Sequence, residues 1–323
     1  MKAIVCKQYG QPEVLQLKEV EKPIPKDNEI LVRNYATTVT AADTMMRKGK
    51  PYIGRLYLGL KRSKKPILGF EFAGEIVAVG KDVKLFKVGE KVFGGTTKLG
   101  CFAEYLCVNE NEIITSIPEN LSYEEAAPVS GSAITVLNFL KGLANIKKND
   151  KVLINGASGA LGTYSVQYAK HIGVEVTGVC STANIELVKS LGADKVIDYT
   201  KNDFTKSGEK YDIIFDTVGK RSYAECKNSL TKNGVYLSPV LSFSLFIQSI
   251  LTSISGSKKA KFSFTGMLPV KVRLAYFLEL KELLRTEKIK TIIDRHYLLS
   301  QMPESHRYVE KGHKKGNVII TLF

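Results

Sequence analysis

The stretch 151–162, KVLINGASGALG, constrains the fold more than any other part of the chain. Residues of strand character at 152–155 lead into glycines at 156, 159 and 162, and apolar residues at helical spacing follow as far as Gly173. A strand, a glycine turn and a helix in this order gather free backbone N–H groups where a pyrophosphate can bind. Gly156 allows the turn, Gly159 lets a phosphate approach the backbone, and Gly162 lets the helix pack close to the strand.

A glycine triplet alone is weak evidence, because any tight strand-to-helix turn can use one. Here a second strand, VEVTGVC at 174–180, follows at the spacing of a βαβ unit. Strands and helices then alternate as far as about residue 240, which is typical of a parallel sheet covered by helices on both faces. The sequence therefore predicts a dinucleotide site. Its loop residues are Gly156, Ser158, Gly159, Ala160, Leu161 and Gly162.

Residues 1–121 differ in texture from this alternating region. Short runs rich in β-branched residues are separated by Gly, Pro and Asn turns, which predicts a barrel-like antiparallel domain. From Ser122 the spacing becomes helical, and Ser122 with Glu125 forms a capping box. We therefore expect three segments: 1–121, 122–265 and 266–323. A chain of 323 residues is long for a single core and suits two domains.

The net charge of +15 is carried mainly by lysine. A solvated lysine-rich surface explains it, and attraction of anionic cofactors, nucleic acid or acidic membrane surfaces stays open. Five scattered cysteines without a CxxC pair predict a reducing compartment, with neither a disulfide framework nor a thiolate zinc site. No apolar signal core follows Met1, so we expect a cytoplasmic protein.

The segment 236–257 contains no charged residue, yet Pro239, Gln248 and its many serines argue against a membrane span. Its apolar residues share one helical face, with serines on the other. Three interpretations remain open. The segment is a surface helix docked on the core or on a partner subunit, a mobile wall over an apolar substrate site, or a contact with a membrane surface. The apolar residues are Phe243, Phe246, Ile247, Ile250, Leu251 and Ile254.

Several motifs together resemble the medium-chain dehydrogenase/reductase superfamily, in its zinc-independent quinone oxidoreductase-like (zeta-crystallin-like) branch. They are VTAAD (39–43), GFEFAGEIVAVG (69–80), VGEKVFG (88–94), NGASGALG (155–162), SLGADKVIDY (190–199), FDTVG (215–219) and KKGNVIIT (314–321). The resemblance covers nearly the whole chain. It implies an α/β protein in which a GroES-like β-barrel catalytic domain holds an inserted Rossmann domain, a doubly wound parallel sheet. The C-terminal segment then returns to the first domain.

The resemblance also argues against a catalytic zinc. Zinc-dependent relatives carry a Cys shortly before an Asp and a His in a GHE motif, whereas Thr40 and Phe70 stand at these positions here. The four-cysteine lobe that binds a structural zinc is absent from the sequence as well. The four histidines, at 171, 296, 306 and 313, form no ligand pattern. We therefore expect a zinc-independent enzyme with no metal site.

NADPH is the expected cofactor. NAD sites usually end their second strand with Asp or Glu, which binds the ribose 2′-hydroxyl, but here the strand ends in Cys180, Ser181 and Thr182. We expect a 2′-phosphate to meet hydroxyl donors there and no like charge. In similar reductases the tyrosine of the IDY motif, here Tyr199, lies near this phosphate, and a basic residue close to the C-terminal strand, here Lys315, contributes.

The reaction implied by the resemblance is hydride transfer from NADPH to a quinone; the alternative is reduction of an enone or alkenal carbon–carbon double bond. Thr40, Asp43 and Tyr52 are the catalytic candidates. Tyr52 could donate a proton, although a packed loop aromatic explains it as well. The remaining cofactor residues are Thr135, Gly219 and Ser238. A basic nucleic-acid-binding protein on a dinucleotide fold is the non-enzymatic alternative, without a supporting motif. We also expect a homodimer.

Overall fold

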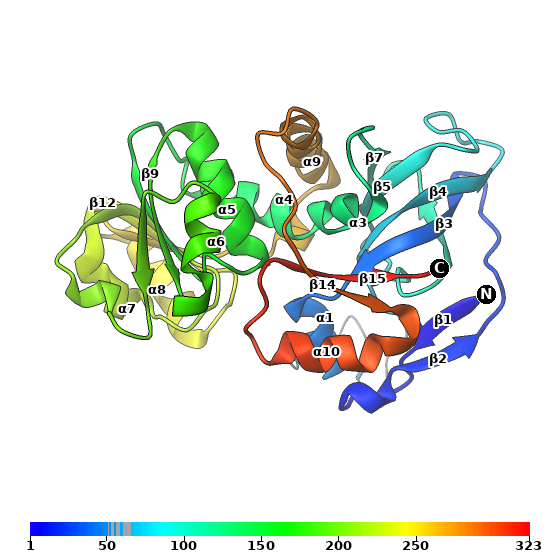
Figure 1. Cartoon of the computed structure of the whole chain (residues 1–323), viewed down its shortest axis with the longest axis horizontal. Helices are drawn as coiled ribbons and strands as arrows, with labels where there is room; N and C mark the ends of the chain where they lie inside the picture. The colour runs from blue at the N-terminus through cyan, green and yellow to red at the C-terminus, as the bar shows by residue number, and fades with distance from the viewer. Residues whose placement is uncertain (51, 53–54, 56–58, 61–65) are drawn as a thin grey trace. The chain divides into compact units, whose positions relative to one another are not determined.

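The computed structural model describes residues 1–50, 52, 55, 59–60 and 66–323. These residues form two compact units, and Figure 1 labels many of their elements. Unit 1 comprises Met1–Gly131, Val270–Arg285 and Thr291–Phe323. Unit 2 comprises Ser132–Pro269 and Thr286–Lys290.

The passage from unit 1 to unit 2 lies about ten residues later than the sequence boundary at 122. Residues 122–131 stay with unit 1 because their last polar groups bond to its sheet. The Ser130 hydroxyl donates to the Gly94 carbonyl over 2.7 Å, and the Gly131 N–H donates to the Glu71 carboxylate over 2.6 Å. The capping box of Ser122 and Glu125 is present, as predicted, at the start of α3 (Tyr123–Ala126).

Unit 2 is built on a parallel sheet, as the alternating pattern predicted. Its strands lie in the order β10-β9-β8-β11-β12-β13, so the order reverses between β8 and β11. Val152, Leu153 and Ile154 in β8 are fully buried, because helices cover both faces of the sheet (Figure 1). The strands are β8 (Lys151–Asn155), β9 (Glu175–Cys180), β10 (Lys195–Asp198), β11 (Tyr211–Asp216), β12 (Leu230–Leu237) and β13 (Lys259–Lys261).

The helices of unit 2 include the one predicted after the glycine loop. It begins at Ala160 and ends at Gly173, which has a left-handed φ of 86° and donates its N–H to the last carbonyls of the helix. The α-helices of this unit are α4 (Ser132–Leu137), α5 (Ala160–Ile172), α6 (Ile185–Ser190), α7 (Tyr223–Cys226) and α8 (Phe243–Ile254).

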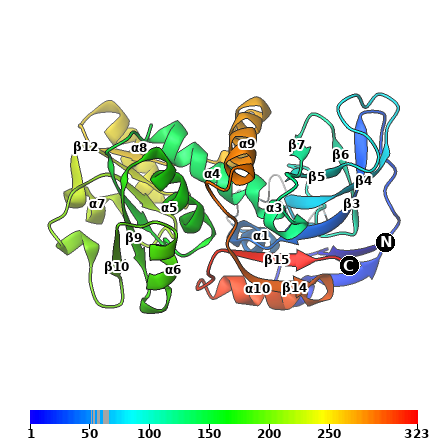
Figure 2. The same cartoon turned by 45° about the horizontal axis from the view of Figure 1, so that its top comes forward.

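Unit 1 is β-rich, as predicted, but its main sheet draws strands from both ends of the sequence. The order is β14-β15-β3-β4-β5-β7, and β6 pairs with β3. The late strand β15 therefore lies between β14, to which it is parallel, and β3, to which it is antiparallel (Figure 2). The strands are β1 (Lys2–Val5), β2 (Gln16–Glu19), β3 (Glu29–Thr38), β4 (Glu71–Val79), β5 (Lys91–Gly95), β6 (Tyr105–Asn109), β7 (Ile113–Ser116), β14 (Ile293–Leu298) and β15 (Asn317–Thr321).

Two helices of unit 1, α1 (Ala41–Arg47) and α10 (Met302–Glu310), pack together around buried polar groups; the same unit also contains α9 (Val270–Arg285). The Arg47 side chain is fully buried and pairs with Glu310. His306 is also fully buried, its ring edge-on to Phe102 at 6.1 Å between centroids. Neither nitrogen of His306 has a hydrogen-bond partner among the described residues.

Helix α8 argues against one part of the first interpretation of segment 236–257, docking on the core, and leaves docking on a partner subunit and the other two interpretations open. Its apolar residues do not dock on the core of its own unit, because Phe243, Ile254 and the four apolar residues between them on that face are all exposed. Of the described helices, none combines the length and the apolar character needed to cross a bilayer.

Candidate cofactor site

The loop between β8 and α5 has the geometry of an anion site. Gly156 adopts a left-handed φ of 81°, and its N–H and that of Ala157 both donate to the Val179 carbonyl over 3.0 Å, which fixes the loop on β9. Gly159 is the N-cap of α5, and no side chain caps this helix end. The positive end of the helix dipole is thus left for an anion, at the point where the strand order reverses.

The glycines at 159 and 162 differ in the space around them. A Cβ at Gly159 would meet only the Gly156 carbonyl oxygen, at 3.5 Å, which is ordinary contact. A Cβ at Gly162 would lie 2.1 Å from that same oxygen, too close for any side chain. Gly162 is therefore required by packing against the loop backbone, rather than against the strand as expected. Gly159 leaves open space. Of the other loop residues, Ser158 and Ala160 are buried and Leu161 is partly exposed.

Asn184 connects the loop to the end of β9, and sequence reasoning missed it. Its side-chain amide donates to the Ser158 hydroxyl over 3.0 Å and to the Ser181 hydroxyl over 3.2 Å. Asn184 is buried, and its Oδ1 has no hydrogen-bond partner among the described residues. A buried acceptor between two hydroxyl-bearing loops fits a polar ligand at this corner. Nothing in the sequence around Asn184 distinguishes it from an ordinary residue of a helix start.

The expectation that no negative charge lies near the end of β9 is wrong. Asp198 ends the neighbouring strand β10, directly beside Cys180 in the parallel register. Its carboxylate accepts hydrogen bonds from the hydroxyls of Thr182 and Thr200, which lower its pKa. The Thr182 hydroxyl therefore already donates its proton to this carboxylate. The Lys201 ammonium lies 3.9 Å from the same carboxylate and partly balances it. The sequence of the second strand alone does not reveal this carboxylate, because the pairing of β10 with β9 brings it there.

Tyr199 follows Asp198 and is half exposed, and its N–H donates to the Cys180 carbonyl over 3.0 Å. It lies beside Ser181 and Thr182 through the pairing of β9 with β10. The half-exposed side chain lies at the edge of the predicted site, and the hydrogen bond to Cys180 holds its backbone on β9.

Asp216 holds the loop after β11 in place through hydrogen bonds. It is fully buried, and its carboxylate accepts from the Asn155 side-chain amide over 2.8 Å and from the N–H groups of Gly219 and Arg221 over 3.0 Å. The Tyr236 hydroxyl also donates to it, over 3.2 Å. Asp216 therefore joins the carboxyl ends of β8, β11 and β12. It belongs to the FDTVG motif, but the motif alone did not reveal its role.

The predicted residues Gly219, Ser238 and Thr135 lie in unit 2 as well. Gly219 has a left-handed φ of 72°, and a Cβ there would meet the Val240 side chain at 2.5 Å. The buried Ser238 hydroxyl accepts from the Val240 N–H over 3.3 Å, so Val240, in the turn after β12, adjoins both Ser238 and the loop of Gly219 after β11. Thr135 lies on α4 and is partly buried.

The catalytic candidates lie in unit 1, and two of them form the N-terminal cap of α1. The Thr40 hydroxyl and N–H both donate to the Asp43 carboxylate, over 2.6 and 2.8 Å. Burial raises the pKa of Asp43 to about 6 in spite of these hydrogen bonds. Tyr52 is 68% exposed, with the Arg55 guanidinium 4.9 Å from its ring centre. Lys315 is exposed in the same unit, and its N–H donates to Asp294. That these residues face the cofactor stays a prediction.

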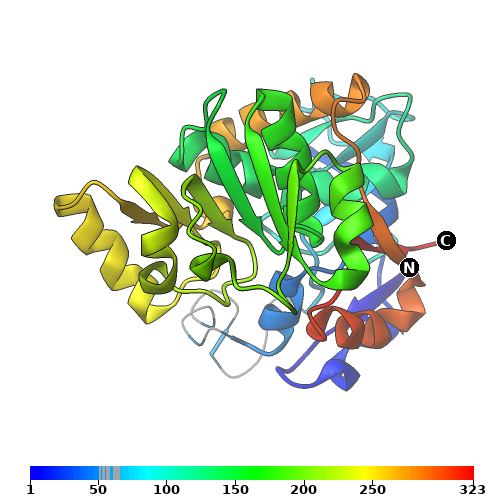
Figure 3. The same ribbon diagram turned by 60° about the vertical axis from the view of Figure 1, so that its left-hand side comes forward.

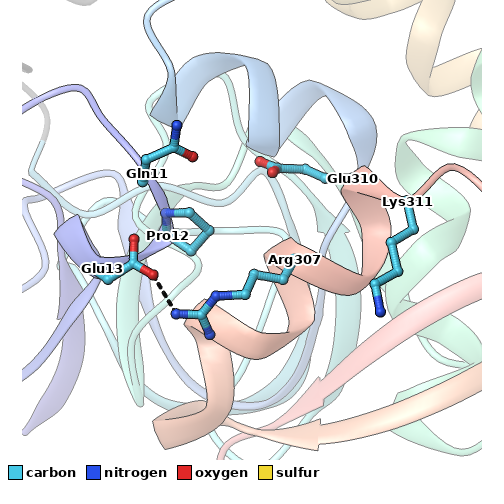
Figure 4. Close-up of a pocket in the computed structure, with 6 residues that line it drawn as sticks. All are labelled: Gln11, Pro12, Glu13, Arg307, Glu310 and Lys311. Carbon is cyan, nitrogen blue, oxygen red and sulfur yellow. Dashed lines mark hydrogen bonds and ion pairs between the residues drawn. The ribbon is translucent and has the colours of Figure 1, made fainter.

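A pocket of about 400 Å³ lies beside α10, and none of the residues predicted to bind cofactor lines it (Figure 4). The Arg307 guanidinium, which lines it, pairs with Glu13 across the opening. Glu310, which also lines the pocket, pairs with Arg47 and Lys48. The complete lining is Gln11, Pro12, Glu13, Arg307, Glu310 and Lys311.

A parallel sheet with this strand order and a glycine loop at its reversal defines a dinucleotide-binding protein. Two family models also match the chain: "Alcohol dehydrogenase GroES-like domain" at residues 26–119 and "Zinc-binding dehydrogenase" at 191–320.

Three curated relatives extend this likeness over the whole chain. The mitochondrial NAD(P)H oxidoreductase RTN4IP1 of Mus musculus is 32% identical, over 100% of this chain and 89% of its own. A chloroplastic quinone oxidoreductase of Triphysaria versicolor is 32% identical, over 99% and 98%. A 2-methylene-furan-3-one reductase of Solanum lycopersicum is 29% identical, over 99% and 79%.

Two solved structures are similar to this chain over its whole length. The quinone oxidoreductase from Coxiella burnetii has a TM-score of 0.86 and 27% identity, over 100% of this chain and 99% of its own. The Escherichia coli quinone oxidoreductase complexed with NADPH has a TM-score of 0.86 and 25% identity, over 100% of both chains. The chain therefore belongs to the medium-chain dehydrogenase/reductase superfamily, in its quinone oxidoreductase-like branch. This membership confirms the predicted fold class and the prediction of an oxidoreductase.

Proposed function

We propose that this protein is an NADPH-dependent oxidoreductase that transfers hydride to a quinone. The observation that carries the proposal is the glycine loop, which leaves open space at Gly159 beside the uncapped N-terminus of α5. Relatives named as NAD(P)H and quinone oxidoreductases support it. When bound, the nicotinamide supplies the hydride, and the protein supplies orientation and a dry environment.

The chain's own residues would hold the cofactor at two places. The N–H groups at the start of α5 suit the pyrophosphate. The Ser181 hydroxyl, Tyr199 and the Lys201 ammonium surround the corner where the 2′-phosphate is expected. The negative charge of Asp198 opposes a phosphate there, and Lys201 offsets it only in part. We therefore propose that the enzyme prefers NADPH to NADH, and that this preference is smaller than it would be without the carboxylate of Asp198.

Zinc independence is part of the proposal. The Thr40 hydroxyl is engaged by Asp43, and Phe70 has no donor atom. In the part of the chain that the structure describes, no three His, Cys, Asp or Glu side chains gather as metal ligands would. Hydride transfer to a quinone does not require a Lewis acid, because solvent can protonate the hydroquinone.

Enone reduction is the second candidate, and the likeness to a 2-methylene-furan-3-one reductase favours it. This reaction needs a proton delivered to carbon. Asp43, with its pKa of about 6, and the exposed Tyr52 are the groups to test as donors. Nucleic-acid binding, suggested by the charge of +15, is the non-enzymatic alternative.

The test is the oxidation of NADPH and of NADH, followed by absorbance, across a panel of quinones, enones and aldehydes. Turnover of quinones above enones supports the proposal; the reverse order supports the second candidate. Absence of turnover together with a salt-dependent electrophoretic shift of RNA or DNA would instead favour the nucleic-acid alternative.

We also propose a cytoplasmic homodimer. Strand β13 forms one edge of the sheet of unit 2, and none of the described strands pairs with its outer side, which supports association through this edge. The scattered cysteines of the sequence, which predict a reducing compartment, support the location. Sedimentation equilibrium tests the dimer, and imaging of the tagged protein tests the location.

A further inference from the structure

Helix α8 presents its apolar side outwards, contrary to the usual arrangement of a surface helix. Phe243 and Ile254, at its two ends, are 82% and 80% exposed. Only Leu245 and Thr252 of the helix are buried, and the Thr252 hydroxyl accepts from the Ala260 N–H of β13 over 3.0 Å. The helix is thus attached to its unit through these two residues, and Figure 3 shows it in yellow at the outer side of unit 2. We call the outward residues the apolar face of α8: Phe243, Phe246, Ile247, Ile250, Leu251 and Ile254.

The apolar surface continues beyond the helix. The ring of Phe246 lies 6.2 Å from that of Phe262, which in turn lies 5.9 Å from Phe264. Phe264 is half exposed, and Met267 is 82% exposed. Monomeric soluble proteins rarely expose a contiguous apolar patch of this kind without a partner that covers it.

Two serines of α8 form hydrogen bonds within the helix itself. The Ser249 hydroxyl donates to the Phe246 carbonyl over 2.8 Å, and the Ser253 hydroxyl donates to the Ile250 carbonyl over 2.7 Å. Hydroxyls bonded within their own helix cost less to move into an apolar medium than free ones do. The helix can therefore enter an apolar layer without leaving these donors unpaired.

The sequence that flanks the helix is basic. Residues 226–269 contain no Asp or Glu, whereas they contain lysines at 227, 232, 258, 259 and 261. Lys227 and Lys232 are exposed, and the Lys258 ammonium donates to the Lys227 carbonyl over 2.8 Å. An apolar helical face beside lysines is the pattern of a helix that lies in the headgroup layer of a membrane.

We propose that the apolar face of α8 and the lysines beside it dock on a lipid bilayer with anionic headgroups. A second copy of the chain fits less well. A two-fold interface places the same patch of both copies together, so two lysine-bearing patches, without a carboxylate from residues 226–269, would face each other. Anionic lipid supplies both the apolar layer and the opposite charge. With twelve residues, α8 is too short to span a bilayer and suits a position in its surface.

The experiment is vesicle flotation of the full chain, with phosphatidylcholine vesicles that contain or lack phosphatidylglycerol. The wild type is expected to float with the anionic vesicles, and less so at high salt. The double variant Phe243→Ser, Ile254→Ser should bind at least roughly a hundredfold more weakly, because two large apolar side chains no longer enter the bilayer. Lys227→Glu with Lys232→Glu should weaken binding several-fold.

Matched controls lie in unit 1. Ile24 and Leu85 are exposed apolar residues, at 87% and 63%, and Ile24→Ser with Leu85→Ser should leave flotation unchanged. Lys7→Glu with Lys18→Glu changes the net charge by the same amount at exposed lysines elsewhere, and it should have a smaller effect than the Lys227 and Lys232 pair. Circular dichroism and cofactor affinity confirm that each variant is folded.

Three results would overturn the proposal. The wild type does not float with anionic vesicles; the control pairs reduce flotation as much as the α8 pairs; or Phe243→Ser with Ile254→Ser converts a dimer into monomers in sedimentation experiments without lipid. The last result would assign the apolar face to a second copy. The proposal does not rest on the quinone substrate, because flotation reports lipid binding whatever the enzyme reduces.

Discussion

At the scale of single residues, substitutions at Gly159 and at Gly162 should have different effects, one on cofactor binding and the other on stability, although both glycines belong to the glycine loop. Gly159 has extended dihedrals and open space around its Cα, so Gly159→Val should fold normally. Its side chain should fill the space that a pyrophosphate needs and weaken NADPH binding at least a hundredfold, about 2.7 kcal/mol. Gly162→Val should instead destabilise the protein, because its Cβ would lie 2.1 Å from a carbonyl oxygen.

Fluorescence titration with NADPH and thermal unfolding by circular dichroism separate the two effects. Near-normal affinity in folded Gly159→Val would place the cofactor elsewhere. An unchanged melting temperature in Gly162→Val would show that the loop moves aside.

Cofactor preference depends on the charges at the end of β9. We expect the wild type to prefer NADPH, and Ser181→Asp to weaken NADPH strongly and NADH little. Two like charges about 4 Å apart near a protein surface repel by about 4 kcal/mol before salt screening, and a quarter of that changes affinity several-fold. Asp198→Asn removes a negative charge from this corner and should raise the preference for NADPH. Tyr199→Ala should weaken NADPH by a smaller factor.

The measurement is kcat/KM with each cofactor for the wild type and the three variants. Equal use of NADPH and NADH by the wild type would contradict the proposal. If Ser181→Asp affects both cofactors alike, Ser181 only ends a strand. An unchanged ratio in Asp198→Asn would mean that its hydrogen bonds to the two threonines screen its charge completely.

At the scale of elements, the packing of α10 on α1 predicts a pH dependence of stability. Burial, with the neighbouring positive charges of Arg47 and Lys48, lowers the pKa of His306 to about 3, against 6.5 in an exposed histidine. Between these two values the unfolded chain binds a proton that the folded chain does not. Stability should therefore fall as the pH drops through this window, by up to about 1.4 kcal/mol for each pH unit.

The variant His306→Leu isolates this effect in urea unfolding at pH 7 and pH 5. Asp43 titrates with the opposite sign, since its pKa is raised to about 6 and protonation favours the folded state below that value. It is present in both proteins and cancels in their difference. The wild type should lose more stability than His306→Leu on acidification. Equal losses would mean that His306 becomes protonated without unfolding.

The helices and strands themselves were largely predictable from the sequence. The spacing of apolar residues, the glycines that end helices and the capping boxes all depend on residues that are close together in the chain. The helix after the glycine loop, its end at Gly173 and the capping box at Ser122 are examples. Contacts between strands were not predictable in this way. Asp198 adjoins Cys180 only because β10 pairs with β9, and Asp216 meets Asn155 only because β11 pairs with β8. The outward direction of the apolar face of α8 was equally hidden, since period does not reveal which side of a helix is buried.

At the scale of the whole molecule, the absence of zinc-ligand spacing in the sequence predicts resistance to chelation. EDTA and phenanthroline should leave both the turnover of the purified enzyme and its melting temperature unchanged. Elemental analysis of the same sample provides the control. Stoichiometric zinc that is lost together with activity would contradict the proposal of a zinc-independent enzyme.

The position of β15 between β14 and β3 has a consequence for synthesis on the ribosome. The chain emerges from its N-terminus, yet residues 36–38 of β3 receive their partner only when residues 319–321 have been made. At about 5–20 residues per second, the segment from unit 1's first boundary at Gly131 to the last strand takes roughly 10–40 s to translate. During that interval the sheet of unit 1 keeps an unpaired edge at β3. The residues of unit 2, in contrast, are all present once Lys290 has been made. The half of the protein that is made first is therefore the half that is completed last.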